Sequence, residues 1–127
     1  ANESPDKGYL DDLYEFHFET KKWSRSQTKG TSPCPRSRFR MIPYNDSIYL
    51  FAGWNSTKHF STLHRYNIYT KQWVEVDTTF DADGIGQFSM VENNGIMFVF
   101  SGFSPKVGCR TNLFAYPLAP SPCRQAH

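Results

Sequence analysis

The chain has 127 residues, of which 39% are hydrophobic, 20% charged and 17% aromatic. This length suits one domain or part of one, and the composition is typical neither of a disordered tail nor of a membrane protein. The formal net charge of +2 is too small for the basic field of a typical nucleic-acid-binding domain. Apolar runs such as Ile96 to Phe100 are far too short to span a bilayer.

The first predicted elements are two strands within the segment from Leu13 to Trp23. Its apolar and polar residues alternate imperfectly, and the same pattern of Leu, aromatic, Thr, Lys and Trp recurs 50 residues later, from Leu63 to Trp73. A third, partial copy starts at Leu113, again 50 residues on, and departs from the pattern at Pro117. A period of this length indicates a repeated supersecondary unit.

Two further strands, about 38–44 and about 48–53, are predicted between these copies. The run from Ile48 to Gly53 matches the run from Met97 to Gly102, with an offset of 49 residues. Polar clusters around Asn45 and Asn94 separate the paired runs and suit tight hairpins, because Asn tolerates a positive φ. After a long loop, strands at about 62–69 and 72–77 complete a unit of four.

The unit from Arg36-Ser37 through Ile48 to Gly53, Leu63, Tyr66-Asn67 and Trp73 resembles a kelch repeat, one blade of a kelch β-propeller. The resemblance implies an all-β fold, here a propeller segment of about two to three four-stranded antiparallel blades that does not close by itself. The pairs Ala52-Gly53 and Ser101-Gly102 depart from the usual Gly-Gly at the end of the second strand.

The pattern divides the chain into four parts. Residues 1–36 are expected to hold the end of one kelch blade and an inter-blade loop, 37–77 a complete blade, 78–117 a partial third blade, and 118–127 a Pro-rich tail. Because such a segment leaves raw strand edges and half-covered faces, we expect the remaining blades to come from the same longer chain or from other chains.

The repeated residues are interpreted as scaffold. Trp23 and Trp73 are expected to be buried between neighbouring blades, and Gly53 and Gly102 to let the second strand pass close to another backbone. The full set of structural repeat residues is Leu13, Trp23, Gly53, Leu63, Tyr66, Trp73, Gly102 and Leu113.

Function is expected where the copies differ, in the loops that line the rim and the central channel. The predicted loops run from Trp54 to Ser61, from Phe103 to Thr111, from Ser24 to Ser37 and from Asp77 to Gly86. Aromatic and arginine side chains in such places are the usual anchors of protein interfaces. The candidate partner-binding residues are Arg38, Arg40, Trp54, Asn55, Lys58, His59, Phe103, Lys106 and Arg110. Some of these residues also have a structural alternative. The aromatic rings would cover the bases of their loops, and the arginines would pair within the chain.

No metal or other cofactor is expected, because the four histidines and three cysteines show no ligand spacing. Cysteine usage of this kind also predicts a cytoplasmic protein with reduced thiols. Two N-glycosylation sequons, at Asn2 and Asn55, leave an extracellular alternative.

The segments from Phe51 to Trp54, from Phe98 to Phe103 and from Asn112 to Phe114 are similar to successive blades of the leucine-zipper-like transcriptional regulator family. That similarity implies a non-catalytic protein–protein interaction module that recognises substrates for a cullin-3 ubiquitin ligase, with Ras-family small GTPases as targets. The alternatives are a scaffold or cytoskeletal or organelle docking protein and, on a galactose-oxidase-like scaffold, a copper enzyme.

Overall fold

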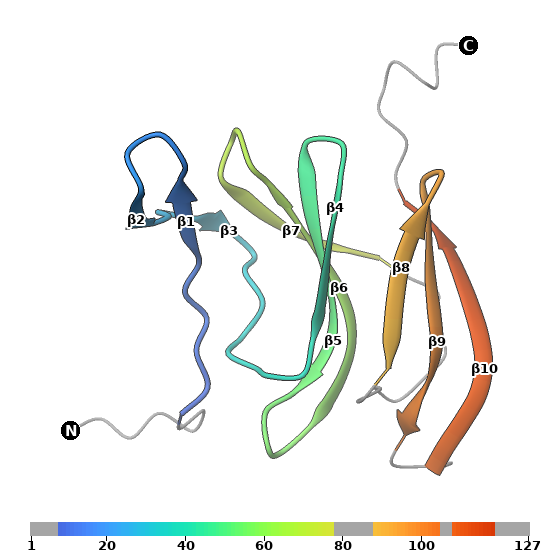
Figure 1. The fold of residues 1–127 in the computed structure, drawn as a ribbon. Coiled ribbons are helices and arrows are strands. Elements are labelled where there is room, and N and C mark those ends of the chain that lie inside the picture. Colours follow the sequence, from blue (N-terminus) through green and yellow to red (C-terminus); the bar gives the residue numbers. More distant parts are fainter. Residues whose placement is uncertain (1–7, 78–87, 105–107, 119–127) are drawn as a thin grey trace.

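In the computed structural model, structure is described for residues 8–77, 88–104 and 108–118. All regular elements in these ranges are β-strands, so the all-β prediction is confirmed (Figure 1). The strands are β1 (Tyr14–His17), β2 (Lys22–Arg25), β3 (Lys29–Gly30), β4 (Arg40–Tyr44), β5 (Ser47–Trp54), β6 (His59–Asn67), β7 (Gln72–Val76), β8 (Ser89–Asn93), β9 (Ile96–Ser104) and β10 (Gly108–Pro117).

The strands form three sheets that stand side by side in chain order, as expected for a partial propeller (Figure 1). The first pairs β1 with β2, the second has the order β3-β7-β6-β5-β4, and the third has the order β10-β9-β8. Within the second sheet, β4 to β7 form the complete antiparallel blade. We call these sheets the first, central and third blade.

The repeat seen in the sequence is also a repeat in geometry. Phe16 lies opposite Trp23 in the first blade, as Tyr66 lies opposite Trp73 in the central blade. The intervening turns match as well, because Lys21 and Lys71 adopt φ values of 58° and 59°. The two segments, 50 residues apart in the sequence, therefore fold as the same strand–turn–strand unit.

The central blade is covered on both faces. Its face toward the first blade carries the buried Leu50, Tyr66 and Trp73, against which Leu13 of the first blade packs. Its other face forms a shared core with the third blade. That core contains Ile42, Tyr49, Phe51, Ala52 and Leu63 from the central blade, with Phe88, Met97, Val99 and Leu118 from the chain beyond it. Both faces are thus stabilised by burial against neighbouring blades.

Strand β3 was not predicted, since its residues were assigned to an inter-blade loop. The connection runs along the outer edge of the central blade and pairs in parallel with β7. The backbone N–H of Thr31 donates to the Trp73 carbonyl at 3.1 Å. Gly30 has φ 84°, and a Cβ there would overlap the Trp73 carbonyl oxygen, so a glycine is required at this crossing.

The rim loops are shorter than predicted. Strand β5 extends through Trp54 and β6 begins at His59, so the connecting loop is residues 55–58 rather than Trp54 to Ser61. In the third blade, β9 reaches Ser104 and β10 begins at Gly108, which likewise shortens the loop predicted from Phe103 to Thr111. Cross-strand pairing continues beyond a bulge between Phe51 and Gly53 and so lengthens the hairpin.

The expected burial of Trp23 is wrong for this chain. Trp23 is 70% exposed, whereas its repeat counterpart Trp73 is 5% exposed. Trp73 packs on Leu50, which belongs to the second strand of its blade, and the described part of the first blade holds only β1 and β2. Leu113 differs from Leu63 in the same way, with 62% exposure against 0%.

This pair gives a matched test of blade packing. In the 127-residue chain, Trp73→Ala is expected to lower the free energy of unfolding by about 3–5 kcal/mol, because it removes a buried ring. Trp23→Ala is expected to lower it by less than about 1 kcal/mol, because most of that ring is already in water. Chemical denaturation of the two variants measures the difference, and equal losses would contradict the assignment of the faces.

Candidate functional site

The candidate site lies at the end of the central blade where β5 and β6 are joined. An isolated bridge connects Ser37 to Trp54, with N–H to carbonyl distances of 2.8 and 2.7 Å in the two directions. The bridge holds the chain that enters β4 against the end of β5. It therefore fixes the position of Arg38, the next residue, relative to Trp54.

Four rings at this rim are linked by successive ring contacts, and we call them the rim ladder: Tyr9, Trp54, His59 and Phe103. The ring centroids are separated by 6.1 Å between Tyr9 and Trp54, 6.0 Å between Trp54 and His59, and 6.0 Å between His59 and Phe103. Trp54 and His59 are half-buried, and Phe103 is 40% exposed. The ladder thus crosses all three blades and presents part of its surface to solvent.

The rim ladder follows from the repeat. Tyr9 and His59 are 50 residues apart, and Trp54 and Phe103 are 49 residues apart, which are the two offsets of the repeat. The contact of Tyr9 with Trp54 therefore recurs one blade later as the contact of His59 with Phe103. Tyr9 precedes the third strand of the first blade, and His59 is the first residue of the third strand of the central blade. Each ring touches a residue of the next blade that follows a Gly in the second strand, Trp54 in the first case and Phe103 in the second.

Two cations lie over aromatic rings at this rim. The Arg38 guanidinium is 4.7 Å from the Trp54 ring centroid, and the Lys58 ammonium is 5.5 Å from that of Phe60. Both side chains are exposed, and the described residues provide neither of them with an ion pair. Arg38 also has φ 60°, an uncommon conformation for a residue with a side chain.

Asn55 shapes the hairpin tip. Its Oδ1 accepts hydrogen bonds from the backbone N–H groups of Thr57 at 3.1 Å and Lys58 at 2.9 Å. Ser56 between them adopts φ 70°. This local turn, a common role of Asn, holds Lys58 next to His59 on the rim.

Arg36 supports the site from below and was not among the predicted site residues. Its side chain is 6% exposed and donates to the carbonyls of Cys34 at 3.0 Å and Ala52 at 3.2 Å, and to the Thr62 hydroxyl at 3.1 Å. The guanidinium also stacks on Phe60 at 3.8 Å. These contacts tie the β3–β4 connection to both strands of the hairpin that carries Trp54 and His59.

Burial is the main influence on Arg36 and lowers the pKa of its guanidinium. The hydrogen bond to Cys34 and the charge of Glu75 act in the opposite direction. Gly53 permits the arrangement, because its φ is 115° and a Cβ would lie 2.9 Å from the Ser37 carbonyl oxygen and 3.0 Å from Arg36 Cδ. Comparison of the repeats alone overlooks Arg36, since Ile85 stands at the equivalent position one blade later.

The other predicted partner-binding residues are Arg40, Lys106 and Arg110. Arg40 donates to the Phe39 carbonyl at 3.2 Å and lies 5.8 Å from the Phe88 ring centroid, at the boundary with the third blade. Arg110 pairs through its backbone with Gly102 in β10 and β9. Lys106 lies outside the described residues. The structure brings together Arg38, Trp54, Asn55, Lys58, His59 and Phe103.

His64 is buried beside this support. Its imidazole is 5% exposed and lies 6.4 Å from the Trp73 ring, and its Nδ1 has no hydrogen-bond partner among the described residues. Burial lowers the pKa of His64, the charge of Arg36 lowers it further, and that of Glu75 raises it. A neutral imidazole is therefore favoured in the folded chain.

The described ranges hold neither a metal-binding cluster nor a membrane-spanning helix. No three His, Cys, Asp or Glu side chains there are grouped so that they could hold a metal ion. Within the same ranges, no helix is long and apolar enough to cross a membrane.

Replacement of Arg36 tests its supporting role. Arg36→Lys is expected to lower the free energy of unfolding by about 2–4 kcal/mol, because an ammonium cannot reproduce the planar fork that reaches three separate acceptors. Arg40→Lys is the matched control, since Arg40 is exposed, and should change stability by less than about 0.5 kcal/mol. Urea denaturation measures both variants, and similar losses would refute the role.

The buried His64 predicts a pH dependence. Because its folded-state pKa lies below its usual value of 6.5, the unfolded chain binds more protons as the pH falls below about 6.5. The neutral His64 imidazole contributes fully to the free energy of unfolding above about pH 6.5, and this contribution decreases as the pH falls toward the folded-state pKa. Denaturation at several pH values should show this decrease. His64→Leu should reduce this decrease, and an unchanged profile for His64→Leu would contradict the assignment.

Comparison with known proteins places this architecture in a family. Residues 3–119 match the family described as the KLHDC2/KLHL20/DRC7 Kelch-repeats domain. The leucine-zipper-like transcriptional regulator 1 of Pongo abelii is 32% identical over 97 residues, which are 73% of this chain and 12% of that protein. Its Drosophila melanogaster homolog is 28% identical over 95 residues, 73% of this chain and 10% of that protein.

Similarity extends to an enzyme as well. The N-(sulfonatooxy)prop-2-enimidothioate sulfolyase of Thlaspi arvense is 26% identical over 108 residues, which are 82% of this chain and 31% of that protein. This chain therefore spans about a tenth of the regulators that it matches and under a third of the enzyme. The repeat geometry and the match over residues 3–119 show that the chain belongs to the kelch-repeat family.

Proposed function

We propose that the chain is part of a non-catalytic kelch propeller that binds a protein partner through its rim. The observation that carries this proposal is the rim ladder, flanked by the exposed Arg38 and Lys58. Partly exposed aromatic rings next to arginine are typical of interface anchors. The mixture of apolar and charged groups suits a protein surface better than a uniform polyanion.

The finer proposal is substrate recognition for a cullin-type ubiquitin ligase, with a small GTPase as the target. It is supported by the similarity to leucine-zipper-like transcriptional regulators over 73% of this chain, because that resemblance implies such a role. The second candidate, a docking scaffold, would use the same rim without a ligase. A cytoplasmic location also stays a prediction.

A catalytic role is the alternative that the sulfolyase similarity raises. The rim described here favours binding, because its contacts join rings and cations rather than a nucleophile and a base. Assay of the parent protein for turnover of a sulfated thioimidate would decide, since release of sulfate would contradict the non-catalytic proposal.

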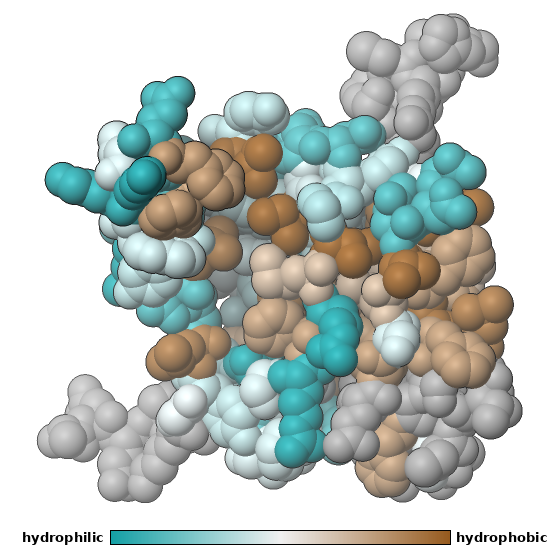
Figure 2. Space-filling view, viewed as in Figure 1, coloured by the Kyte–Doolittle hydropathy of each residue, from teal (hydrophilic) through white to brown (hydrophobic). Residues whose placement is uncertain are grey.

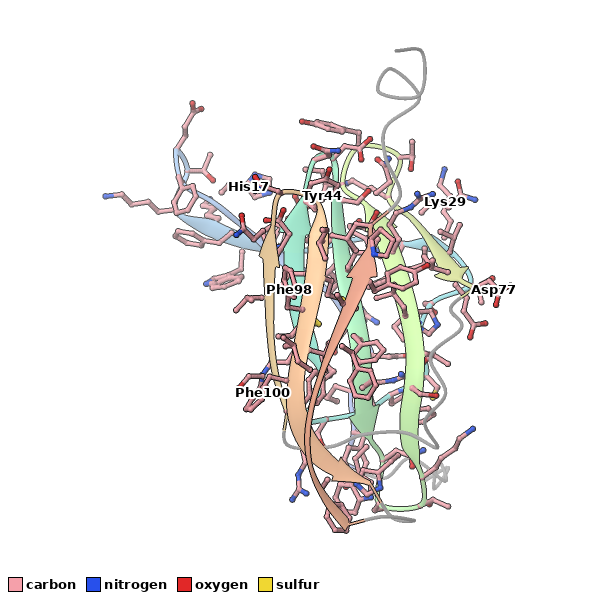
Figure 3. All side chains as sticks on the ribbon, turned by 90° about the vertical axis from the view of Figure 1, so that its right-hand side faces the viewer. His17, Lys29, Tyr44, Asp77, Phe98 and Phe100 are labelled. Carbon is pink, nitrogen blue, oxygen red and sulfur yellow. The ribbon has the colours of Figure 1, made fainter. Side chains whose placement is uncertain are left out.

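We also propose that further blades cover the two outer faces of this segment. On the third blade, the outward face carries Val91, Phe98, Phe100 and Leu113, of which Phe100 is 51% exposed. Apolar colour gathers on that side in Figure 2, and Figure 3 views it face-on, with Phe98 and Phe100 labelled. Such a face is stabilised by a neighbouring blade.

Between the first and central blades lies a cavity of about 60 Å³ that is lined by Leu13, Met41, Leu50 and Trp73, among others. It lies where the inner strands of a complete first blade would pack. In a parent protein that supplies those strands, Trp23→Ala should therefore destabilise as strongly as Trp73→Ala, in contrast to the 127-residue chain. A small loss in both settings would argue against propeller completion.

Binding to a Ras-family GTPase tests the finer proposal. The full-length parent protein should bind the purified GTPase, and Arg38→Ser combined with Lys58→Ser should weaken binding about tenfold, because two exposed charge contacts are lost. Lys22→Ser is the control, because Lys22 is an exposed cation at the start of β2, after the β1–β2 turn. Biolayer interferometry measures the affinities, and absence of binding by a correctly folded protein would exclude this target.

A further inference from the structure

The geometry of the rim points to a chemical class of partner. We propose that the rim ladder binds an extended acidic segment of a partner protein. Apolar side chains on one face of that segment would lie on the rings, and carboxylates between them on the same face would contact Arg38 and Lys58. The inference rests on the proposed function, in that it takes the rim as the interaction site, and it names the chemistry recognised there.

The spacing of the rings is the first argument. An extended peptide rises about 3.3 Å per residue, so its alternate side chains on one face lie about 6.6 Å apart. Successive ring centroids of the ladder are 6.1, 6.0 and 6.0 Å apart. The separation of alternate side chains in an extended peptide therefore matches the separation of each pair of touching rings.

Accessibility is the second argument. The ladder rings are neither buried nor fully exposed: Tyr9, Trp54 and His59 are half-buried, and Phe103 is 40% exposed. Part of each ring is held by the neighbouring blade, which fixes its orientation before binding. Pre-positioned rings lose little side-chain entropy on association, so the ladder suits a docking surface.

Charge is the third argument. The positive φ of Arg38 and the Ser37–Trp54 bridge hold its guanidinium over the Trp54 ring. The Asn55 turn holds the backbone of Lys58 at the hairpin tip, and the Lys58 ammonium lies near the Phe60 ring. The described residues supply neither cation with a carboxylate. A guanidinium fixed in this manner binds a carboxylate in a bidentate way, which favours a partner segment that carries Asp or Glu.

A single-stranded nucleic acid also combines aromatic stacking with cationic contacts, but the ladder fits it less well. Its rings meet at 89°, 35° and 56°, so they do not offer parallel platforms for successive bases. Two cations would also neutralise few phosphates. The same test distinguishes the two partners.

The experiment uses the parent protein and fluorescein-labelled peptides of about eight residues, long enough to span the ladder. In the first peptide, Leu and Glu occupy every second position in turn with Ser between them, so that both face the rim. Gln replaces Glu in the second peptide and Lys replaces it in the third, and oligothymidine of equal length is the fourth probe. Fluorescence anisotropy should show that the Glu peptide binds about tenfold more tightly than the Gln peptide, with an advantage that decreases as salt is added.

Variants then locate the binding. Arg38→Ser and Lys58→Ser should each weaken binding of the Glu peptide about threefold to fivefold and leave the Gln peptide unchanged. Phe103→Ser should weaken both peptides alike, because it removes a ring rather than a charge. Lys22→Ser should affect neither, and thermal denaturation of each variant verifies that the fold is retained.

Three outcomes would overturn the inference. The Glu and Gln peptides could bind equally well, the Lys peptide or oligothymidine could bind more tightly than the Glu peptide, or the Arg38 and Lys58 variants could leave binding of the Glu peptide unchanged. These outcomes are separate from failure of the proposed function. A GTPase that is not bound, together with a Glu peptide that is, would exclude the target and support the ladder chemistry. If the GTPase binds in a manner that depends on Arg38 and Lys58, but the parent protein shows no preference for the Glu peptide, the proposed function is supported and the ladder chemistry is excluded.

Discussion

Burial of blade faces against neighbouring blades is the constraint on which this structure depends. The central blade satisfies it on both sides, with Trp73 at 5% and Leu63 at 0% exposure. Their counterparts Trp23 and Leu113 have the same local geometry but remain 70% and 62% exposed. Local strand pairing is therefore intrinsic to each copy of the repeat, whereas the hydrophobic stabilisation belongs to the contact between copies.

The candidate site arises from the same inter-blade contacts. Where blades meet at the rim, the contact between Tyr9 and Trp54 recurs between His59 and Phe103, so a structural contact also creates a continuous aromatic surface. Arg36 keeps that surface in place, because it joins the chain entering β4 to Ala52 and Thr62 of the hairpin. The two readings of Trp54 and Phe103, as covers of a loop base and as partner anchors, are therefore compatible.

The sequence predicted the strand repeats well because period, turn residues and strand composition are local properties. It did not predict β3, whose pairing depends on an edge of β7 that only the folded blade presents. It placed Trp54, His59 and Phe103 in rim loops but could not show that their rings touch, since that depends on how blades stack. Arg36 was missed because its role comes from burial and not from repetition. The burial of Trp23 was overestimated because burial depends on packing partners such as Leu50, which packs on Trp73, and the described part of the first blade holds only β1 and β2.

The repeat determines where the rim residues lie but not which residue type occupies each position. The scaffold fixes where a side chain stands on the rim, because each site recurs with the offset of the repeat. The residue at that site is free to vary: one repeat beyond Tyr9 and His59 the equivalent position is Cys109, so the row of rings cannot continue past Phe103 in the same form. A propeller built in this way can keep one architecture and change its partner by exchanging single rim residues. Here, a finite row of rings with Arg38 and Lys58 beside it would select a short segment of matching charge.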